Sequence, residues 1–219
     1  MNATVNPLPP RFASTLGAAS MVMGPALMSI GDLFHPAESW DARAQVTIVA
    51  AAVDRWILAH TLLVVGMLLL VPGILAITRI VALRSAALGY ASRVLFLISV
   101  GALSAAITHE LELGVFVKAA GEQAAITLFE AFDAHVLPVL LPGMFSFFIA
   151  TGLMVAPLAR AAGPFRWPAL CFGLGALLIF GEIALAMVIL SQIGNVLILI
   201  AGIGFARGLR RAEAATAVA

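Results

Sequence analysis

Six apolar stretches of roughly membrane-spanning length limit what this chain can fold into. A hydrocarbon core of about 30 Å needs roughly 20 helical residues to cross it. The last stretch is short, and only Ser191 and Gln192 separate it from its neighbour, which predicts a tight antiparallel pair of helices. The predicted spans cover residues 12–33, 56–78, 94–117, 136–157, 168–190 and 193–206.

The composition agrees with a chain that lives mostly in lipid. Of its 219 residues, 63% are hydrophobic and 11% are charged, whereas soluble domains carry about 45–50% apolar and about 25% charged residues. The predicted fold class is therefore all-α, a polytopic membrane protein built as one six-helix transmembrane bundle over residues 1–211. The alanine-rich segment 212–219 is predicted to be a disordered tail.

Charge and cysteine content exclude several classes of protein. The formal net charge is +1 and there is no basic patch interleaved with aromatic residues, so no nucleic-acid partner is expected. The single Cys171 excludes an intrachain disulfide and a cysteine-based metal cage. The first span has Arg11 in front of it, as signal peptides do, but its apolar run continues to Leu33 without a clear cleavage site. It is therefore interpreted as a span.

The basic residues predict the orientation. Cytoplasmic loops of membrane proteins are enriched in Lys and Arg, and nine of the twelve basic residues fall on the side that carries both termini, which predicts cytoplasmic termini. The three on the opposite side are Arg43, Arg55 and Lys118. The nine are Arg11, Arg79, Arg84, Arg93, Arg160, Arg166, Arg207, Arg210 and Arg211.

Most ionisable side chains gather at one depth. Counting about 1.5 Å per residue from each cytoplasmic end places all four histidines in the outer third of the predicted bundle, together with every acid except Glu213. Ionisable groups in a span usually face the protein interior or a water-filled cavity and mark functional sites. A polar cavity open toward the outer face is therefore expected. Its candidate residues are His60, His109, Glu112, His135 and Glu182.

Three interpretations of this layer remain open. Some members, such as Glu38, Asp41, Asp54 and Glu122, fit the plainest one, in which they are solvated helix ends and loops. The second is a metal or haem site, and it would use neutral imidazoles from several helices to hold a divalent metal such as zinc, or a haem b iron.

The proposed metal ligands are His60, His109 and His135. His109 and Glu112 lie three residues apart and so share a helical face, a spacing that metal ligands use in helical bundles. The third interpretation is acid–base chemistry on a lipophilic substrate by an isomerase, cyclase or hydrolase. A carboxyl group in an apolar pocket can stay protonated and donate. The proposed catalytic residues are Glu182, His109 and Glu112, with no cofactor-binding residue.

Two alternatives involve no enzymatic reaction. The chain could be a membrane subunit whose polar rim contacts a partner or stiffens the bundle, or a small proton-coupled transporter. Beyond the bilayer, the expected partners are a lipophilic small molecule and, for the subunit alternative, another protein chain.

The motif Phe132-Asp133-Ala134-His135 opens the predicted helix that closes near Pro157. With this motif, the layout resembles a family of small bacterial multi-helix membrane proteins catalogued as a domain of unknown function. The resemblance implies a six-helix protein of the bacterial inner membrane over residues 12–204. It points to Asp133 and His135 and implies no activity.

Overall fold

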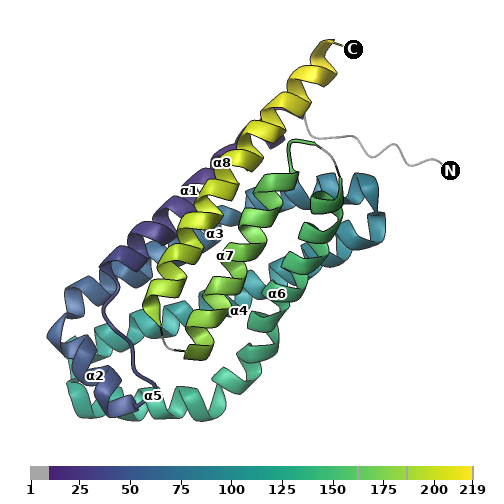
Figure 1. The fold of residues 1–219 in the computed structure, drawn as a ribbon. Helices are drawn as coiled ribbons and strands as arrows, with labels where there is room; N and C mark the ends of the chain where they lie inside the picture. Colours follow the sequence, from purple (N-terminus) through teal and green to yellow (C-terminus); the bar gives the residue numbers. More distant parts are fainter. Residues whose placement is uncertain (1–9, 162, 186, 219) are drawn as a thin grey trace.

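The structure is a computed structural model that describes the backbone of residues 10–161, 163–185 and 187–218, and most side chains between Thr15 and Arg211. These residues form eight helices and no strand (Figure 1). The helices are α1 (Pro10–Phe34), α2 (Ala42–Ala51), α3 (Val53–Arg84), α4 (Ala86–Ala120), α5 (Glu122–His135), α6 (Leu137–Arg160), α7 (Arg166–Leu185) and α8 (Val188–Val218).

Five of the described helices are long and apolar enough to cross a bilayer, which supports the prediction of a multi-pass helical membrane protein. The predicted span 168–190 corresponds to α7, which is not among these five. The five segments are Thr15–Phe34, Val53–Arg84, Ala86–Ala120, Leu137–Arg160 and Val188–Arg211.

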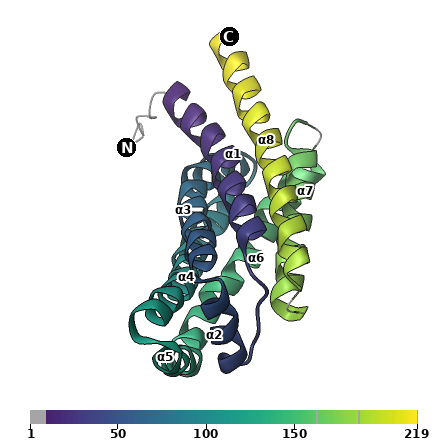
Figure 2. The same ribbon diagram turned by 90° about the vertical axis from the view of Figure 1, so that its left-hand side faces the viewer.

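The six longer helices form a closed ring in which each packs on its neighbours in the chain. α1 contacts α3, α3 contacts α4, α4 contacts α6, α6 contacts α7, and α7 contacts α8, which returns to pack on α1. The start of α1 and the end of α8 therefore lie at the same end of the bundle (Figures 1 and 2). Short helices α2 and α5 lie across the opposite end, where they contact each other.

The turn between the last two long helices lies earlier than the sequence predicts. α7 ends at Leu185 and α8 begins at Val188, so Ser191 and Gln192 lie inside α8 instead of forming the connection. Helical placement satisfies both side chains, because Ser191 Oγ donates to the Val188 carbonyl (2.9 Å) and Gln192 Nε2 donates to the Asp32 carbonyl (3.1 Å). At its other end α8 continues to Val218, into the segment predicted as a disordered tail.

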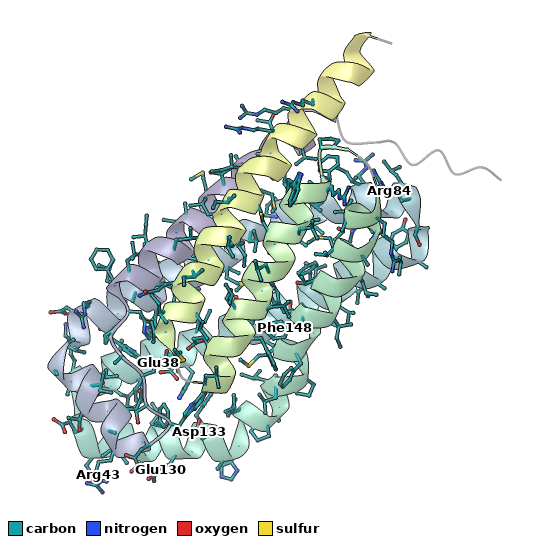
Figure 3. All side chains as sticks on the ribbon, in the orientation of Figure 1. Glu38, Arg43, Arg84, Glu130, Asp133 and Phe148 are labelled. Carbon is teal, nitrogen blue, oxygen red and sulfur yellow. The ribbon has the colours of Figure 1, made fainter. Side chains whose placement is uncertain are left out.

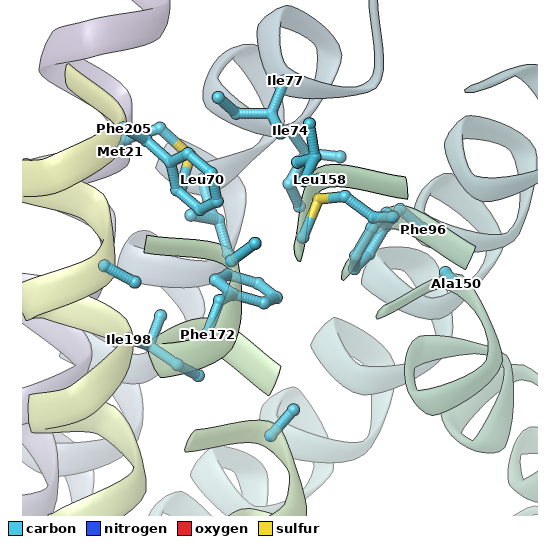
Figure 4. Close-up of a cluster of buried hydrophobic side chains, with 14 of the residues drawn as sticks. Met21, Leu70, Ile74, Ile77, Phe96, Ala150, Leu158, Phe172, Ile198 and Phe205 are labelled. Carbon is cyan, nitrogen blue, oxygen red and sulfur yellow. The ribbon is translucent and has the colours of Figure 1, made fainter. Parts of the chain in front are cut away.

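The middle of the ring is filled by apolar side chains that all six long helices contribute. Close-packed cores of this kind fix helix positions because each side chain fills space left by its neighbours. Figure 4 shows part of this cluster, with ten labelled members. They are Met21, Leu70, Ile74, Ile77, Phe96, Ala150, Leu158, Phe172, Ile198 and Phe205.

Glycines allow α1 to approach two other helices closely. Gly24 and Gly66 face each other where α1 crosses α3, and a Cβ on either would lie within 3 Å of the other's carbonyl oxygen. The tightest approach is at Gly202 of α8, where a Cβ would overlap the Met21 carbonyl oxygen. Small residues permit such backbone contact between membrane helices, so these glycines set the position of α1.

A second, smaller apolar cluster joins the short helices to the bundle. Trp56 at the start of α3 is fully buried there among Val46 and Val49 of α2, Leu113 of α4 and further apolar residues. Its indole nitrogen Nε1 donates to the carbonyl oxygen of Glu110, 2.6 Å away. This bond ties α3 to α4 at the depth of the polar layer.

The charged residues divide between the two ends of the bundle as the sequence suggests. Figure 3 shows Glu38, Arg43, Glu130 and Asp133 at the end covered by α2 and α5, and Arg84 at the end that carries the termini. The polar layer therefore lies at the end opposite the chain termini.

Candidate functional site

A cavity of about 310 Å³ opens between the helices near the end covered by α2 and α5. Its walls are mainly apolar side chains from α1, α3, α4, α5, α6, α7 and α8. Pockets for small molecules typically combine such walls with a few polar groups that fix the ligand's orientation. Here seven ionisable residues line the cavity: Asp32, His35, Glu38, His60, Glu110, Asp133 and Glu182.

Two histidines face each other in this lining. Nδ1 of His35 lies 2.7 Å from the Pro36 carbonyl oxygen, and Nδ1 of His60 lies 2.9 Å from the Trp56 carbonyl oxygen. Because a carbonyl oxygen can only accept, each Nδ1 carries the hydrogen, and in a neutral ring Nε2 is then a free acceptor. The two Nε2 atoms are 3.3 Å apart, so two imidazole lone pairs are directed at one small region.

A carboxyl group completes this region. Oε1 of Glu38 lies 3.3 Å from Nε2 of His35. Burial raises the pKa of Glu38, and burial lowers the pKa of His35. Both directions favour the neutral forms, a carboxylic acid and an imidazole, so the hydroxyl of Glu38 can donate to Nε2 of His35. Glu182 of α7 lies near Glu38 in the same lining, which brings two acids and two histidines together.

Another acid, Asp32, is held by α8. Asn195 Nδ2 donates to Asp32 Oδ2 at 2.6 Å, and both residues are buried. This orientation of the amide leaves its Oδ1 buried without a hydrogen-bond partner among the described residues. Oε2 of Glu110 is likewise buried and unpartnered there. Both are carbonyl- or carboxyl-type oxygens in the cavity lining, where an unpartnered polar atom is costly.

The fifth acid, Asp133, comes from α5. It is half-buried, and burial raises its pKa. His135, two residues on, is exposed, so the two side chains point in different directions, as their spacing on a helix predicts. Of the motif that carries the family resemblance, Phe132 and Asp133 therefore line the cavity.

The structure separates the candidate residues that the sequence singles out. His60 and Glu182 line the cavity. His109 is buried but lies outside the lining, with its ring stacked on Phe132 at a centroid distance of 3.5 Å. Glu112 is exposed on α4 and does not share the surroundings of His109.

A metal centre finds no support in this geometry. In the part of the chain that the structure describes, no three His, Cys, Asp or Glu side chains are grouped so that they could hold a metal ion. His60, His109 and His135 in particular are not brought together, because the first lines the cavity, the second stacks on Phe132 and the third is exposed.

The sequence contains a periodic pattern that indicates Glu110 as a cavity residue, although His109 and Glu112 beside it are also ionisable. Leu103, Ala106, Ile107 and Glu110 all line the cavity, and their spacing of three and four residues defines one helical face. This spacing favours Glu110 over Glu112 as the inward-facing acid. His35 and Glu38 carry no comparable signal, because they lie in the irregular segment between α1 and α2.

No protein-family model matches the chain. No curated protein and no solved structure is significantly similar to it either. The resemblance of residues 132–135 to a bacterial membrane-protein family therefore stays a prediction.

Proposed function

We propose that this protein binds a lipophilic molecule in the cavity and catalyses a proton-transfer reaction on it, such as an isomerisation. The observation that carries the proposal is the position of Nε2 of His35, which lies 3.3 Å from Oε1 of Glu38 and 3.3 Å from Nε2 of His60. Glu182 lines the same cavity. This arrangement provides an acid and a base within one small region. An isomerisation needs only the removal of a proton at one atom and its return at another, with no co-reactant.

The roles follow from the chemistry of each group. In our proposal His35 accepts a proton through Nε2, and His60 stabilises the resulting imidazolium from 3.3 Å away. A protonated carboxyl group, Glu182 or Glu38, returns a proton to the substrate at another atom. Transfer of the proton from His35 back to the carboxylate, through Glu38 at 3.3 Å, then restores the starting state. A positioned acid or base typically contributes about 10²–10⁴-fold to the rate.

The lining restricts the class of substrate. Its apolar walls, which include Met67, Leu103 and Phe148, suit a hydrocarbon or ring system. Glu110 and Asn195 each have a buried side-chain oxygen without a partner among the described residues, and such an oxygen can accept a hydrogen bond. No described lining residue is Lys or Arg, so a lipophilic molecule with a hydroxyl or amine head group fits better than one with an anionic head.

The placement in the membrane is part of the proposal. We take α7 as a sixth span, place both termini in the cytoplasm by the distribution of basic residues, and place the cavity at the outer face of a bacterial inner membrane. Beyond the cavity the ring is filled largely by apolar side chains, among them the fully buried Phe96, Phe172 and Phe205. A filled centre favours chemistry on a bound molecule over its passage through the bundle.

Deuterium exchange tests the reaction even while the substrate is unidentified. Purified protein is incubated in D₂O with a total lipid extract, and the extract is screened by mass spectrometry for molecules that gain deuterium at carbon. We expect wild type to label at least one lipophilic molecule and Glu182→Gln to label it about 100-fold more slowly or worse. Equal labelling by the two proteins would rule out Glu182 as the acid.

A pair of adjacent alanines tests the location of the binding site. Ala106 lines the cavity, whereas Ala105 is exposed on a different side of α4. Ala106→Phe should fill the cavity and abolish both labelling and retention of the molecule during purification. Ala105→Phe adds the same side chain outside the cavity and should leave both intact.

A further inference from the structure

A second hollow lies at the other end of the bundle, where α7 begins and α8 approaches the C-terminus. It measures about 390 Å³. Ten residues from these two helices and the preceding loop line it: Pro164, Trp167, Pro168, Cys171, Ile200, Ile203, Gly204, Arg207, Gly208 and Arg211. It shares no residue with the acid-rich cavity.

Glycines give this hollow its floor. Gly204 and Gly208 lie one turn apart on α8, and a Cβ there would lie 2.5 Å from a side-chain atom of Pro168 and Phe165, respectively. α8 can therefore pack directly on the start of α7. The larger side chains beside these glycines form the walls of the hollow.

The charged residues that line the hollow are all basic. Arg207 and Arg211 are both exposed and lie four residues apart, so they share one face of α8. The other eight lining residues include no acid. The first turn of α7, which contains Trp167 and Pro168, adds the positive end of a helix dipole. Arginines bind phosphate oxygens by paired hydrogen bonds that carry charge.

Polar and apolar groups are ordered along the hollow. Ile200 and Ile203 lie on α8 toward the middle of the bundle from the two arginines. Ile200 and Arg211 are eleven positions apart on the helix, which is about 16 Å at 1.5 Å per residue. Trp167, which also lines the hollow, is 73% exposed. Tryptophans of membrane proteins concentrate at the level of lipid head groups. The hollow is thus cationic at its outer end and apolar at its inner end.

We infer that this hollow binds an anionic phospholipid, with the phosphate between Arg207 and Arg211 and an acyl chain along Ile200 and Ile203. Basic pockets between membrane helices are known to take lipid head groups of this charge. The inference is independent of the proposed reaction, since the two sites lie at opposite ends of the ring. The lipid would hold α8 against α7 in the leaflet that faces the chain termini.

Native mass spectrometry of the full chain in detergent tests the inference with three probes: dioleoyl phosphatidylglycerol, dioleoyl phosphatidylcholine and inorganic phosphate. We expect wild type to bind phosphatidylglycerol at least several-fold more tightly than phosphatidylcholine. The double variant Arg207→Gln/Arg211→Gln should lose about tenfold of that affinity. Inorganic phosphate at the same concentration should not displace the lipid, because it cannot use the apolar end.

The matched control is Arg79→Gln/Arg84→Gln, which removes two charges from the same end of the bundle at exposed positions outside the hollow. It should bind phosphatidylglycerol like wild type. The inference fails if the control loses affinity equally, if the two lipids bind alike, or if inorganic phosphate displaces the lipid. Circular dichroism shows whether each variant is folded. Should the first pair not fold, Ile203→Glu, which places an acid in the apolar end, gives the same comparison.

Discussion

The Nε2 atoms of His35 and His60 lie 3.3 Å apart, although each ring already donates a hydrogen bond from Nδ1 to a backbone carbonyl. Two acceptors at this distance repel unless a hydrogen lies between them or a third group donates to them. Glu38 is the group in position to donate. The two facing nitrogens therefore form a site that can accept a proton.

Nitrogen NMR of histidine-labelled protein can observe this state directly. We expect His35 to be a neutral ring with its hydrogen on Nδ1, and to stay neutral below its ordinary pKa of 6.5, because burial lowers that pKa. His60→Leu removes the facing lone pair that would accept a hydrogen bond from a protonated Nε2 of His35, and should make that nitrogen harder to protonate. A hydrogen found on Nε2 of both rings at neutral pH would contradict the proposed arrangement.

The Glu38 carboxyl makes stability depend on pH. Burial raises its pKa above the ordinary 4.5 in the folded protein, so above that pH the folded state holds a proton that the unfolded state has lost. The free energy of unfolding then falls as pH rises from about 4.5 through the folded pKa. Glu38→Gln removes this dependence, so thermal unfolding in detergent should show a gain over wild type that grows as the pH rises above about 4.5.

Gly202 should be among the least replaceable residues of the chain. In Gly202→Ala the new Cβ would overlap the Met21 carbonyl oxygen, so α1 and α8 must separate, at a cost of about 3 kcal/mol or more in unfolding free energy. Gly152→Ala is the matched control, since a Cβ there meets nothing within 4 Å. An alanine at that helical position should stabilise by up to about 1 kcal/mol. Equal thermal unfolding of the two variants would show that the crossing is looser than described.

Trp56 should hold α3 and α4 together through one hydrogen bond. Trp56→Phe keeps most of the buried ring but removes the donor to the Glu110 carbonyl, which should cost about 1–2 kcal/mol of unfolding free energy. Trp40 is 65% exposed, so Trp40→Phe should change stability by less than about 0.5 kcal/mol. Chemical unfolding followed by circular dichroism measures both.

The fold is the more predictable part. Apolar runs of about 20 residues predict membrane helices because hydrocarbon thickness fixes their length, and five described helices meet that criterion. The end of α7 at Leu185 and the start of α8 at Val188 are not predictable in this way, because Ser191 and Gln192 look like a connection until their helical partners are known. One of those partners is the Asp32 carbonyl, in a helix 160 residues away in the sequence.

The sequence predicts the depth of the candidate site in the bundle, but it identifies only some of the residues that line the cavity. Depth counting places His60 and Glu182 in the correct layer, and both line the cavity. It cannot show which way a side chain points. The three-residue spacing of His109 and Glu112 favours that pair, whereas Glu110 lines the cavity. His35 and Glu38 enter the site through the course of an irregular segment, which helical periodicity does not describe.

The hydrogen bond between Asp32 and Asn195 joins residues 163 positions apart. The Asp32 side chain, near the end of α1, therefore lacks this hydrogen-bond partner until α8 has been synthesised. At about 5–20 residues per second, translation takes roughly 10–30 s to cover that distance. During this interval the Asp32 carboxyl group of the nascent chain has no hydrogen bond from Asn195. Chains that end before α8 never form this bond. The contact that closes the ring between α1 and α8 therefore forms late in synthesis.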